Sequence, residues 1–449
     1  MKTAAARSCV EPRRVRRPAR APLRFTLIGL AALGMPAAMF AAAAAKPASA
    51  TAAQQTASPA SAANAASTVN AAATTAALGD LGLALLRDVP GANAVVSPVA
   101  VATVLGLIQS GANGATEHEI EALFGAGHAG TLALRRELPA LSAQLRADAK
   151  TQGPTRLAAR AWIDRSVGQE VPASYKHRVA QRHGADALVL SFAETEAARA
   201  EINRWTAEHT AGRVAELLPA GSLARSTQIT LTSAMHFRAA WQQPFDATMT
   251  EARPFTTSAT PTTAAAVPTL NGERAVAQAL VEGTQLYALP FASGYDLLIA
   301  LPAEGSGVDA LLKSASGAGF ARWAAALQPA RCSFAMPKFN FAPKSGSIRS
   351  SLQNLGVKTA FTDQADLRPM PGRHAPGAHV DDVHHAAGIA VDEQGGEAVA
   401  AAAATVKPKT LAAPPPACAV DRAFAFVVLH RASGAPLFIG RVGDPARSE

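Results

Sequence analysis

The sequence is poor in aromatic and charged residues. Aromatic residues make up 5% of the 449 residues and charged residues 17%, whereas 49% are hydrophobic. That much apolar content excludes a chain that is disordered throughout. Because alanine supplies much of it, we expect a sizeable core built mainly from small and aliphatic side chains.

Cysteine is also scarce, with three residues at Cys9, Cys332 and Cys418. They form no CxxC pair and no Cys/His spacing, so we expect no structural zinc site. Cys332 and Cys418 could pair in an oxidising compartment, but the sequence cannot show that they come close enough.

Catalytic motifs are missing as well. The chain has no G-x-S-x-G, no H-E-x-x-H and no Walker loop. We therefore expect no enzyme activity and no cofactor. A hydrolase is a remote alternative, which turnover of ester substrates would revive.

One cluster of histidine and aspartate residues has the composition of a metal site: His374, His379, Asp381, Asp382, His384 and His385. Adjacent side chains on a strand point to opposite faces, so the two neighbouring histidines would not converge on one ion. We interpret the cluster as structural and expect no metal.

The net charge of +9 is concentrated at the N-terminus. Residues 1–45 hold eight lysines and arginines and one glutamate, which leaves a small charge on the rest, so we expect no nucleic-acid partner. Residues 25–45 carry no charge and follow this basic stretch, as in a secretory signal. The apolar run is long enough to span a bilayer, so an uncleaved membrane anchor is the alternative. We expect a secreted or periplasmic protein without membrane contact after leader cleavage.

Composition divides the chain into three parts. Residues 1–45 form the leader, and residues 46–75 lack bulky apolar side chains, so we interpret them as a flexible linker. Residues 76–449 would then form one large domain. Helical patterns dominate its first half and strand patterns its second, which predicts an α+β fold. The strand-like runs include those at 229–237, 333–341, 424–429 and 437–442.

Several stretches of this domain are similar to one family, the serpins. They occur in the family's order across the domain: NAVVSP at 93–98, GANGAT at 111–116, INRW at 202–205, TAGRV at 210–214, LTSAMHFRAAW at 231–241, LPF at 289–291, LLIALP at 297–302, MPKF at 336–339, LQNLG at 352–356, HAAGIAVDEQGGEA at 385–398, FAF at 424–426 and LFIGRV at 437–442. The resemblance implies three β-sheets, eight or nine helices and an exposed reactive loop. We expect an exported inhibitory serpin of bacterial type that acts as a monomer.

The resemblance also implies a buried polar cluster that governs the opening of the central sheet. Ser97 and His385 match the family, whereas Ser233 replaces its usual asparagine and Ala100 replaces a usual serine. Trp241 is expected in the core near the top of that sheet, where insertion begins. The two departures put the kinetics of sheet opening in doubt, but not the fold.

The segment that follows the motif at 385–398 can also be interpreted without the family. Residues 398–405 contain no large side chain, so as a strand they could enter a packed sheet without overpacking. One face is entirely small and apolar, and the other carries polar groups at its ends and could face solvent. Composition alone also fits a low-complexity alanine linker. The residues that would form the hinge are Glu393, Gly395, Gly396, Glu397, Ala398 and Ala400.

In the family, the scissile bond lies sixteen residues after the glutamate that opens the hinge. Counting from Glu393 places it at Lys409–Thr410, and a lysine suits the acidic specificity pocket of a trypsin-like serine protease. A slip in register would move the bait to Leu411 or to the alanines and favour chymotrypsin- or elastase-like targets. The main hypothesis is therefore an irreversible inhibitor that forms an acyl-enzyme at Lys409–Thr410 and inserts residues 396–406 into the central sheet.

The alternative is a non-inhibitory serpin that acts as a binding or chaperone-like protein. Gly396, where inhibitory relatives usually have Thr or Ser, motivates it together with Ala100 and Ser233. Glycine is small enough to enter a sheet but is more flexible, and could slow the start of insertion.

Overall fold

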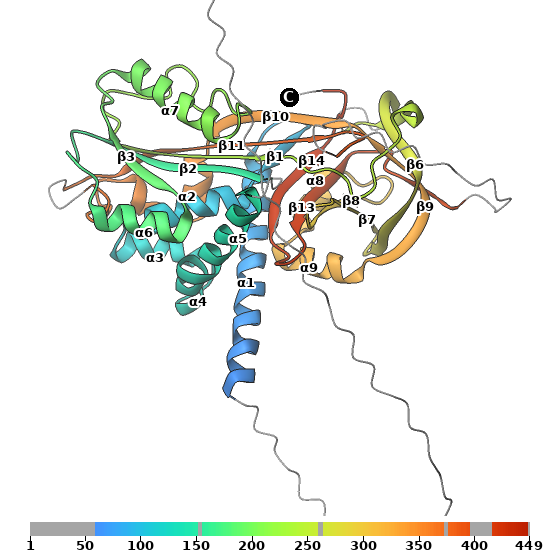
Figure 1. The fold of residues 1–449 in the computed structure, drawn as a ribbon, viewed down its shortest axis with the longest axis horizontal. Coiled ribbons are helices and arrows are strands. Elements are labelled where there is room, and N and C mark those ends of the chain that lie inside the picture. Colours follow the sequence, from blue (N-terminus) through green and yellow to red (C-terminus); the bar gives the residue numbers. More distant parts are fainter. Residues whose placement is uncertain (1–58, 151–154, 259–263, 372–375, 396–414, 448–449) are drawn as a thin grey trace, which may run out of the picture. The chain divides into compact units, whose positions relative to one another are not determined.

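The computed structural model describes residues 59–150, 155–258, 264–371, 376–395 and 415–447 (Figure 1). The α+β fold class is confirmed. The helices are α1 (Pro59–Asp88), α2 (Pro98–Ser110), α3 (Gly114–Ala122), α4 (His128–Leu132), α5 (Leu138–Lys150), α6 (Ala173–His183), α7 (Thr195–His209), α8 (Val308–Ser314), α9 (Gly317–Ala326) and α10 (Arg349–Asn354). None of the described helices is both long and apolar enough to cross a membrane.

A five-stranded sheet runs through the centre of the domain, in the order β10-β11-β4-β2-β3. Its strands are β10 (Phe339–Ser347), β11 (Val380–Val391), β4 (Ile229–Phe237), β2 (Thr155–Asp164) and β3 (Asp186–Leu190). Its third and middle strand, β4, lies parallel to β11, although their first paired positions, Ile229 and Val380, are 151 residues apart in the sequence. The other neighbours of these two strands, β10 and β2, are antiparallel to them.

The second sheet has the order β1-β14-β13-β8-β7-β6-β9-β12, with β5 paired to β6. Its strands are β1 (Ala94–Val96), β5 (Glu251–Thr256), β6 (Ala264–Val281), β7 (Thr284–Pro290), β8 (Tyr295–Leu301), β9 (Gln328–Pro337), β12 (Ala417–Ala419), β13 (Phe424–His430) and β14 (Pro436–Val442). The long β6 pairs with β5 and β9 over its length and with β7 at its C-terminal end. The second and third sheets that the resemblance implies are therefore continuous through β6 in the described residues.

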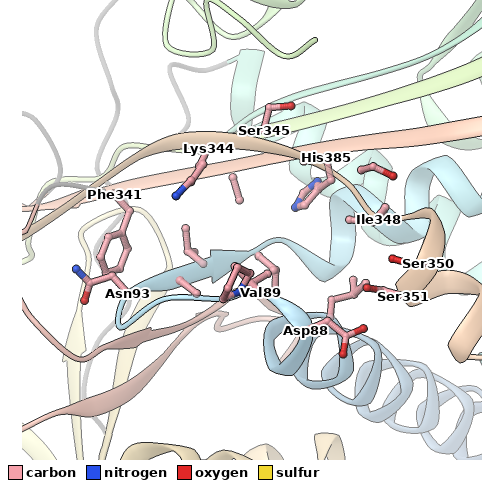
Figure 2. Close-up of a pocket in the computed structure, with 18 of the residues that line it drawn as sticks. Asp88, Val89, Asn93, Phe341, Lys344, Ser345, Ile348, Ser350, Ser351 and His385 are labelled. Atoms are coloured by element: carbon pink, nitrogen blue, oxygen red, sulfur yellow. The ribbon is translucent and has the colours of Figure 1, made fainter. Parts of the chain in front are cut away.

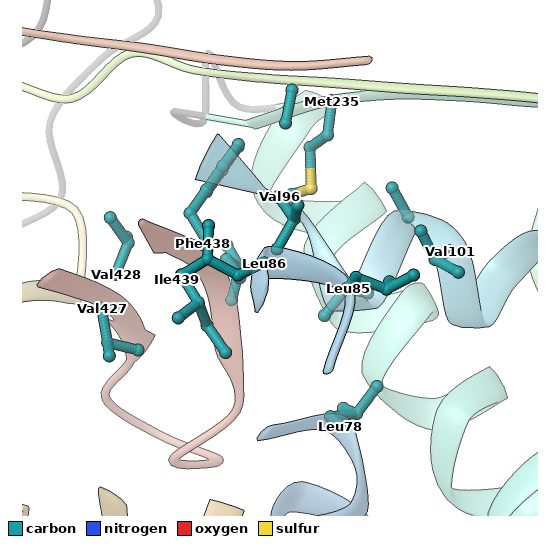
Figure 3. Close-up of a cluster of buried hydrophobic side chains, with 14 of the residues drawn as sticks. Leu78, Leu85, Leu86, Val96, Val101, Met235, Val427, Val428, Phe438 and Ile439 are labelled. Atoms are coloured by element: carbon teal, nitrogen blue, oxygen red, sulfur yellow. The ribbon is translucent and has the colours of Figure 1, made fainter. Parts of the chain in front are cut away.

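The main core lies between the two sheets and is closed by α1 and α2. Every residue of α2 is buried, and the helix begins at Pro98 because the Ser97 hydroxyl accepts from the Ala100 N–H. Figure 3 shows side chains of α1 packed against Phe438 and Ile439 of β14, with Met235 of β4 nearby.

A second, smaller core covers the opposite face of the central sheet. Trp162 of β2 contacts Trp205 of α7 edge to face, with ring centroids 5.5 Å apart. Ala234 of β4 and Ala386 of β11 belong to this cluster. The central sheet is thus covered by α2 and α6 on one face and by α7 on the other (Figure 1). Side chains of both faces in the middle of β4 and β11 are buried.

The first helix begins earlier than the composition predicts. Residues 59–75, part of the predicted flexible linker, form the first turns of α1. Alanine has the highest helix propensity, so an alanine-rich stretch that precedes a packed helix can extend it. The other predicted boundaries, at 45 and 46, lie outside the described residues.

Candidate functional site

The seam between β11 and β4 is the first element of the candidate site. The two strands pair in parallel from Val380 and Ile229 to Ile389 and Phe237. A parallel ladder is slightly less stable per residue than an antiparallel one. A chain that turned back after β11 and ran between the two strands would be antiparallel to both, so one parallel ladder would become two antiparallel ladders.

A tight hairpin turn at the end of β11 already reverses the direction of the chain. The Asp392 N–H donates to the Gly395 carbonyl at 2.9 Å, and the Gly395 N–H donates back at 3.2 Å. On its other side Gly395 forms an antiparallel bridge with Ala240, just beyond the end of β4. The Trp241 N–H also donates to the Gln394 carbonyl at 2.8 Å. Gly395 is therefore flanked by the continuations of both seam strands.

Only glycine fits at this position. Gly395 has a φ of 127°, which L side chains rarely adopt, and a Cβ there would lie 2.1 Å from the Ala239 carbonyl oxygen. The sequence predicted Gly395 as a hinge residue, and the structure gives a steric reason why a glycine stands there.

Trp241 lies beneath this turn. It is 2% exposed, stacks on Phe291 with ring centroids 4.3 Å apart, and contacts Phe245 edge to face. Its indole N–H donates to the Asp392 carbonyl at 2.8 Å. The side chain is thus a core residue whose polar atom holds the hairpin turn at the end of the seam.

An ion pair anchors the side chain of Glu393. Lys338 Nζ lies 2.9 Å from Glu393 Oε2, and the Thr250 hydroxyl donates to Oε1 at 2.8 Å. Burial acts to raise the pKa of Glu393, but the hydrogen bonds from Lys338 and Thr250 outweigh it, so the pKa lies below its ordinary value. Sequence analysis missed this pair, because nothing in the local sequence of Lys338 indicates its partner.

The three residues predicted for the polar cluster come together in the structure. The Ser97 N–H donates to His385 Nε2 at 3.1 Å, and Ser233 Oγ lies 3.0 Å from His385 Nδ1. Because Nε2 accepts, a neutral His385 carries its proton on Nδ1 and donates to Ser233. Burial lowers the pKa of His385 to about 4, although the bond with Ser233 opposes the shift. Ser233 and His385 are cross-strand partners, so separating β4 from β11 must break their bond.

The two departures from the family pattern have visible consequences. Ala100 is fully buried and adds no side-chain polar group. The Ser97 hydroxyl instead donates to Met235 Sδ at 2.9 Å. The role of Ser97, Ser233 and His385 in sheet opening stays a prediction.

A cavity of about 520 Å³ adjoins His385. Figure 2 shows that side chains of β10 and β11, including Lys344 and His385, face it from one side, and that Val89 and Asp88 lie on the other. The space lies next to the polar cluster, against β10 and β11.

The chain that follows the predicted reactive segment, residues 396–410, is held covalently. A disulfide joins Cys332 of β9 to Cys418 of β12, which answers the question that the sequence left open. Backbone pairing places β12 parallel to β9, with Cys418 opposite Phe334. Any cut between residues 332 and 418 therefore leaves both fragments linked until the disulfide is reduced.

The remaining predicted site residues lie outside the described part of the chain. They are Gly396, Glu397, Ala398, Ala400, Lys409 and Thr410. His374 of the histidine cluster also lies outside it. Among the described residues, no group of three or more His, Cys, Asp or Glu side chains could hold a metal ion. His384 Nε2 lies 3.5 Å from Asp382, away from the contacts of His385.

Comparisons with known proteins agree with this architecture. A family model described as Serpin (serine protease inhibitor) matches residues 76–445. Serpin-Z2A of Triticum aestivum is 31% identical over 377 residues, which cover 79% of this chain and 91% of that protein. A serine protease inhibitor of Cyanea capillata is 26% identical over 380 residues, which cover 80% and 94%. These relatives do not confirm the predicted bacterial type.

Solved structures share the fold. Human thyroxine-binding globulin, solved in complex with thyroxine, matches with a TM-score of 0.74 at 22% identity, covering 84% of this chain and all of that one. The thermophilic serpin Tengpin in its native state matches with a TM-score of 0.71 at 20% identity, covering 82% and 94%.

Proposed function

The chain belongs to the serpin family, and on that premise we propose that it is an irreversible inhibitor of trypsin-like serine proteases. The protease serine attacks the Lys409 carbonyl, the Lys409–Thr410 peptide bond breaks, and Thr410 leaves as a new amino terminus. The acyl ester then joins the protease to Lys409. Insertion of residues 396–406 into the seam moves the attached protease before water hydrolyses the ester.

The observation that carries the proposal is the position of Gly395. It is hydrogen-bonded to Asp392 on one side and bridged to Ala240 on the other. Continuing both pairings residue by residue would place residue 406 beside residue 381 of β11 and beside Ile229, the first residue of β4. The small-residue segment would therefore end beside Ile229, where β4 begins.

The same register supports the choice of side chains. Residue 402 would lie between Ser233 and His385, on the face that α2 covers, and it is alanine. Residue 401 would lie between Ala234 and Ala386, which are buried in the second core. Sequence reasoning expected one face of the inserted strand to meet solvent, but in the middle of the seam both faces are covered. Both faces of the inserted strand must therefore carry small side chains there, and alanine at both positions meets this requirement.

The energy of such an insertion is large. The inserted strand replaces one ladder by two, a net gain of about ten backbone hydrogen bonds at about 1 kcal/mol each. That is comparable with the whole stability of an ordinary domain. It is enough to distort a protease attached at Lys409.

The test is to mix the full-length protein with trypsin and look for an adduct that survives boiling in SDS. Reduced samples should show the protease joined to residues 1–409, and mass spectrometry of the released peptide should begin at Thr410. Because of the disulfide, that peptide should remain attached when no reductant is added. Cleavage without an adduct would refute the proposal.

Two variants locate the bond. Lys409→Ala should abolish the trypsin adduct, whereas Lys407→Ala should leave it intact, because the amide after Lys407 belongs to Pro408 and is a poor substrate. An adduct that forms with chymotrypsin or elastase but not with trypsin would move the bait to Leu411 or to the alanines.

A second candidate function is a non-inhibitory binding or chaperone-like serpin. The polar cluster supports it, since buried Ala100 and the Ser97–Met235 contact leave fewer polar bonds beneath the seam than the family pattern would. A related fold, thyroxine-binding globulin, is named for a ligand. Little gain in stability after loop cleavage would favour this function.

We also propose that the protein is exported. The basic and apolar N-terminal residues support export, as does the disulfide, because disulfides persist in oxidising compartments. Whether the leader is cleaved is tested by N-terminal sequencing of protein recovered outside the cytoplasm. An N-terminus at Met1 would indicate an anchored form.

A further inference from the structure

Four arginine side chains line one polar pocket away from the seam. The pocket has a volume of about 800 Å³, within the range of small-molecule sites. It lies between the C-terminal end of α2, the start of α3, one face of α6 and the segment at 368–369. Its arginines are Arg135, Arg178, Arg182 and Arg368.

Carboxylates compensate two of these arginines. Arg135 pairs with Glu117 and lies 3.6 Å from Glu121, and Arg368 pairs with Asp366 at 2.6 Å. The amide nitrogen of Gln109 donates to Glu117 and Glu121 as well. These acidic groups are therefore already engaged.

The other two arginines have no such partner. Among the described residues no carboxylate forms an ion pair with Arg178 or Arg182, and Arg178 donates only to the Ser110 carbonyl, at 3.1 Å. They are four residues apart on α6, so they lie on the same face, where like charges repel. Burial lowers the pKa of Arg182, and repulsion from Arg135 and Arg178 lowers it further, although attraction from Glu117, which also lines the pocket, acts in the opposite direction.

The pocket also offers uncharged hydrogen-bond donors. Ser174, in the first turn of α6, and Asn113 both line it, and the positive end of a helix dipole favours an anion at such a place. Guanidinium groups bind phosphate oxygens in bidentate fashion, and arginines gathered in one pocket of this size suit a compact ligand better than an extended chain.

We propose that this pocket binds a compact anion that carries several phosphate groups, such as an oligophosphate or the phosphate chain of a nucleotide. The phosphate oxygens contact Arg178 and Arg182 and replace the repulsion between them by attraction. This site is independent of the proposed inhibitory function, because it uses none of the residues of the seam.

Titration calorimetry of the full-length protein with inorganic tripolyphosphate tests the proposal, at fixed ionic strength. Each charge-assisted bond to an arginine contributes enough for about a tenfold change in affinity. We expect saturable binding of one tripolyphosphate, weakened about a hundredfold in Arg178→Gln/Arg182→Gln and partly retained in Arg178→Lys/Arg182→Lys. Arg225→Gln, which removes an exposed positive charge in the turn before β4, is the matched control and should bind as the parent does.

Three results would overturn the proposal: no binding of tripolyphosphate, equal binding by the parent and the double glutamine variant, or binding of a long sulfated glycan only. ATP and sulfate serve as further probes. Tighter binding of ATP than of tripolyphosphate identifies a nucleotide, whereas equal binding of sulfate at the same ionic strength contradicts a site for several phosphates. The unfolding midpoint of each variant without ligand checks that the fold is retained.

Discussion

The two ends of the reactive segment are held in different ways. Upstream, the turn at Glu393 and Gly395 is held by hydrogen bonds and by the ion pair with Lys338. Downstream, β12 is fixed to β9 by the Cys332–Cys418 disulfide. The upstream contacts can rearrange into a longer strand, whereas the downstream contact is covalent. After cleavage the upstream end can therefore move, whereas the downstream end stays attached to the rest of the domain.

Cutting the loop should produce the largest effect, because it frees the upstream end to enter the seam. A metalloprotease that cuts between residues 406 and 411 forms no acyl-enzyme, so it yields the cleaved protein without an adduct. We expect the free energy of unfolding to rise by about 10 kcal/mol, measured by urea denaturation.

The matched variant for this experiment is Ala400→Arg, whose long side chain could not enter the face that α2 covers. It should gain little stability on cleavage and should be a substrate of trypsin. Ala413→Arg, beyond the proposed inserted strand, should behave as the parent does. Equal free energies of unfolding for the cut and intact parent protein would contradict the claim that the upstream end enters the seam after cleavage.

Removing the disulfide should have the next largest effect on stability. It should release β12 from β9 without altering the contacts of the upstream end. Closing a loop with a sequence separation of 86 residues stabilises a protein by about 4 kcal/mol in chain-entropy terms. We expect Cys332→Ser/Cys418→Ser to lower the free energy of unfolding by about that amount, measured in urea. After loop cleavage, its fragments should separate in SDS without reductant.

Cys9→Ser is the control for the disulfide variant, since Cys9 lies in the leader and should not alter stability. The trypsin adduct should still form in Cys332→Ser/Cys418→Ser, because insertion uses the upstream end. Loss of the adduct in this variant alone would show that the downstream tether takes part in inhibition.

Acid should weaken the seam through His385. Its folded pKa of about 4 lies below the ordinary value of about 6.5, so the unfolded chain binds the proton more readily. Stability is therefore full above pH 6.5 and falls as the pH drops towards 4, by up to about 3 kcal/mol for this residue. Urea denaturation across this pH range should show that the free energy of unfolding falls as the pH falls. The slope of this dependence should be smaller in His385→Gln.

Two other buried histidines, His183 and His384, also have lowered pKa values owing to burial, so part of the slope should remain in His385→Gln. His118→Gln, at an exposed position of α3, should leave the slope unchanged. An unchanged slope in His385→Gln would contradict the assignment of a neutral, buried His385.

The smallest effect is expected at the upstream anchor. Lys338→Met removes the ion pair of Glu393. Loss of this bond should increase the population in which the turn at 392–395 is open by about tenfold. Hydrogen exchange of the Trp241 and Phe245 amides, both of which donate to this turn, should accelerate accordingly. Arg253→Gln, which removes an exposed ion pair with Glu251 on β5, is the control and should leave exchange there unchanged.

The sequence predicts the strands with strong patterns of β-branched and large apolar residues. The pattern over 229–237 coincides with β4, and those at 424–429 and 437–442 lie within β13 and β14. The predicted strand at 333–341 is two strands, β9 and β10, which separate at Lys338. A strand at the two neighbouring histidines is expected from the sequence, and β11 contains both, but its Ala and Gly residues weaken the strand pattern, so its bounds are not predicted. β6 has Pro268 and Gly272 in its interior, and both weaken a strand signal.

The candidate site was only partly predictable for a related reason. The polar cluster and Gly395 followed from the family motifs, but the Lys338–Glu393 pair joins positions 55 residues apart. Neither residue signals its partner within its local sequence. The pairing of Cys332 with Cys418 likewise depends on β12 lying beside β9. Contacts of this kind are set by the arrangement of the sheets rather than by local propensity.

The most direct test of the central claim is the crystal structure of the full-length protein cut at Lys409–Thr410. We expect a new strand formed by residues 396–406 between β11 and β4, antiparallel to both, with Ala402 between Ser233 and His385. The bond between those two side chains would be lost. A structure in which β11 and β4 remain paired, with residues 396–406 outside the sheet, would contradict the account.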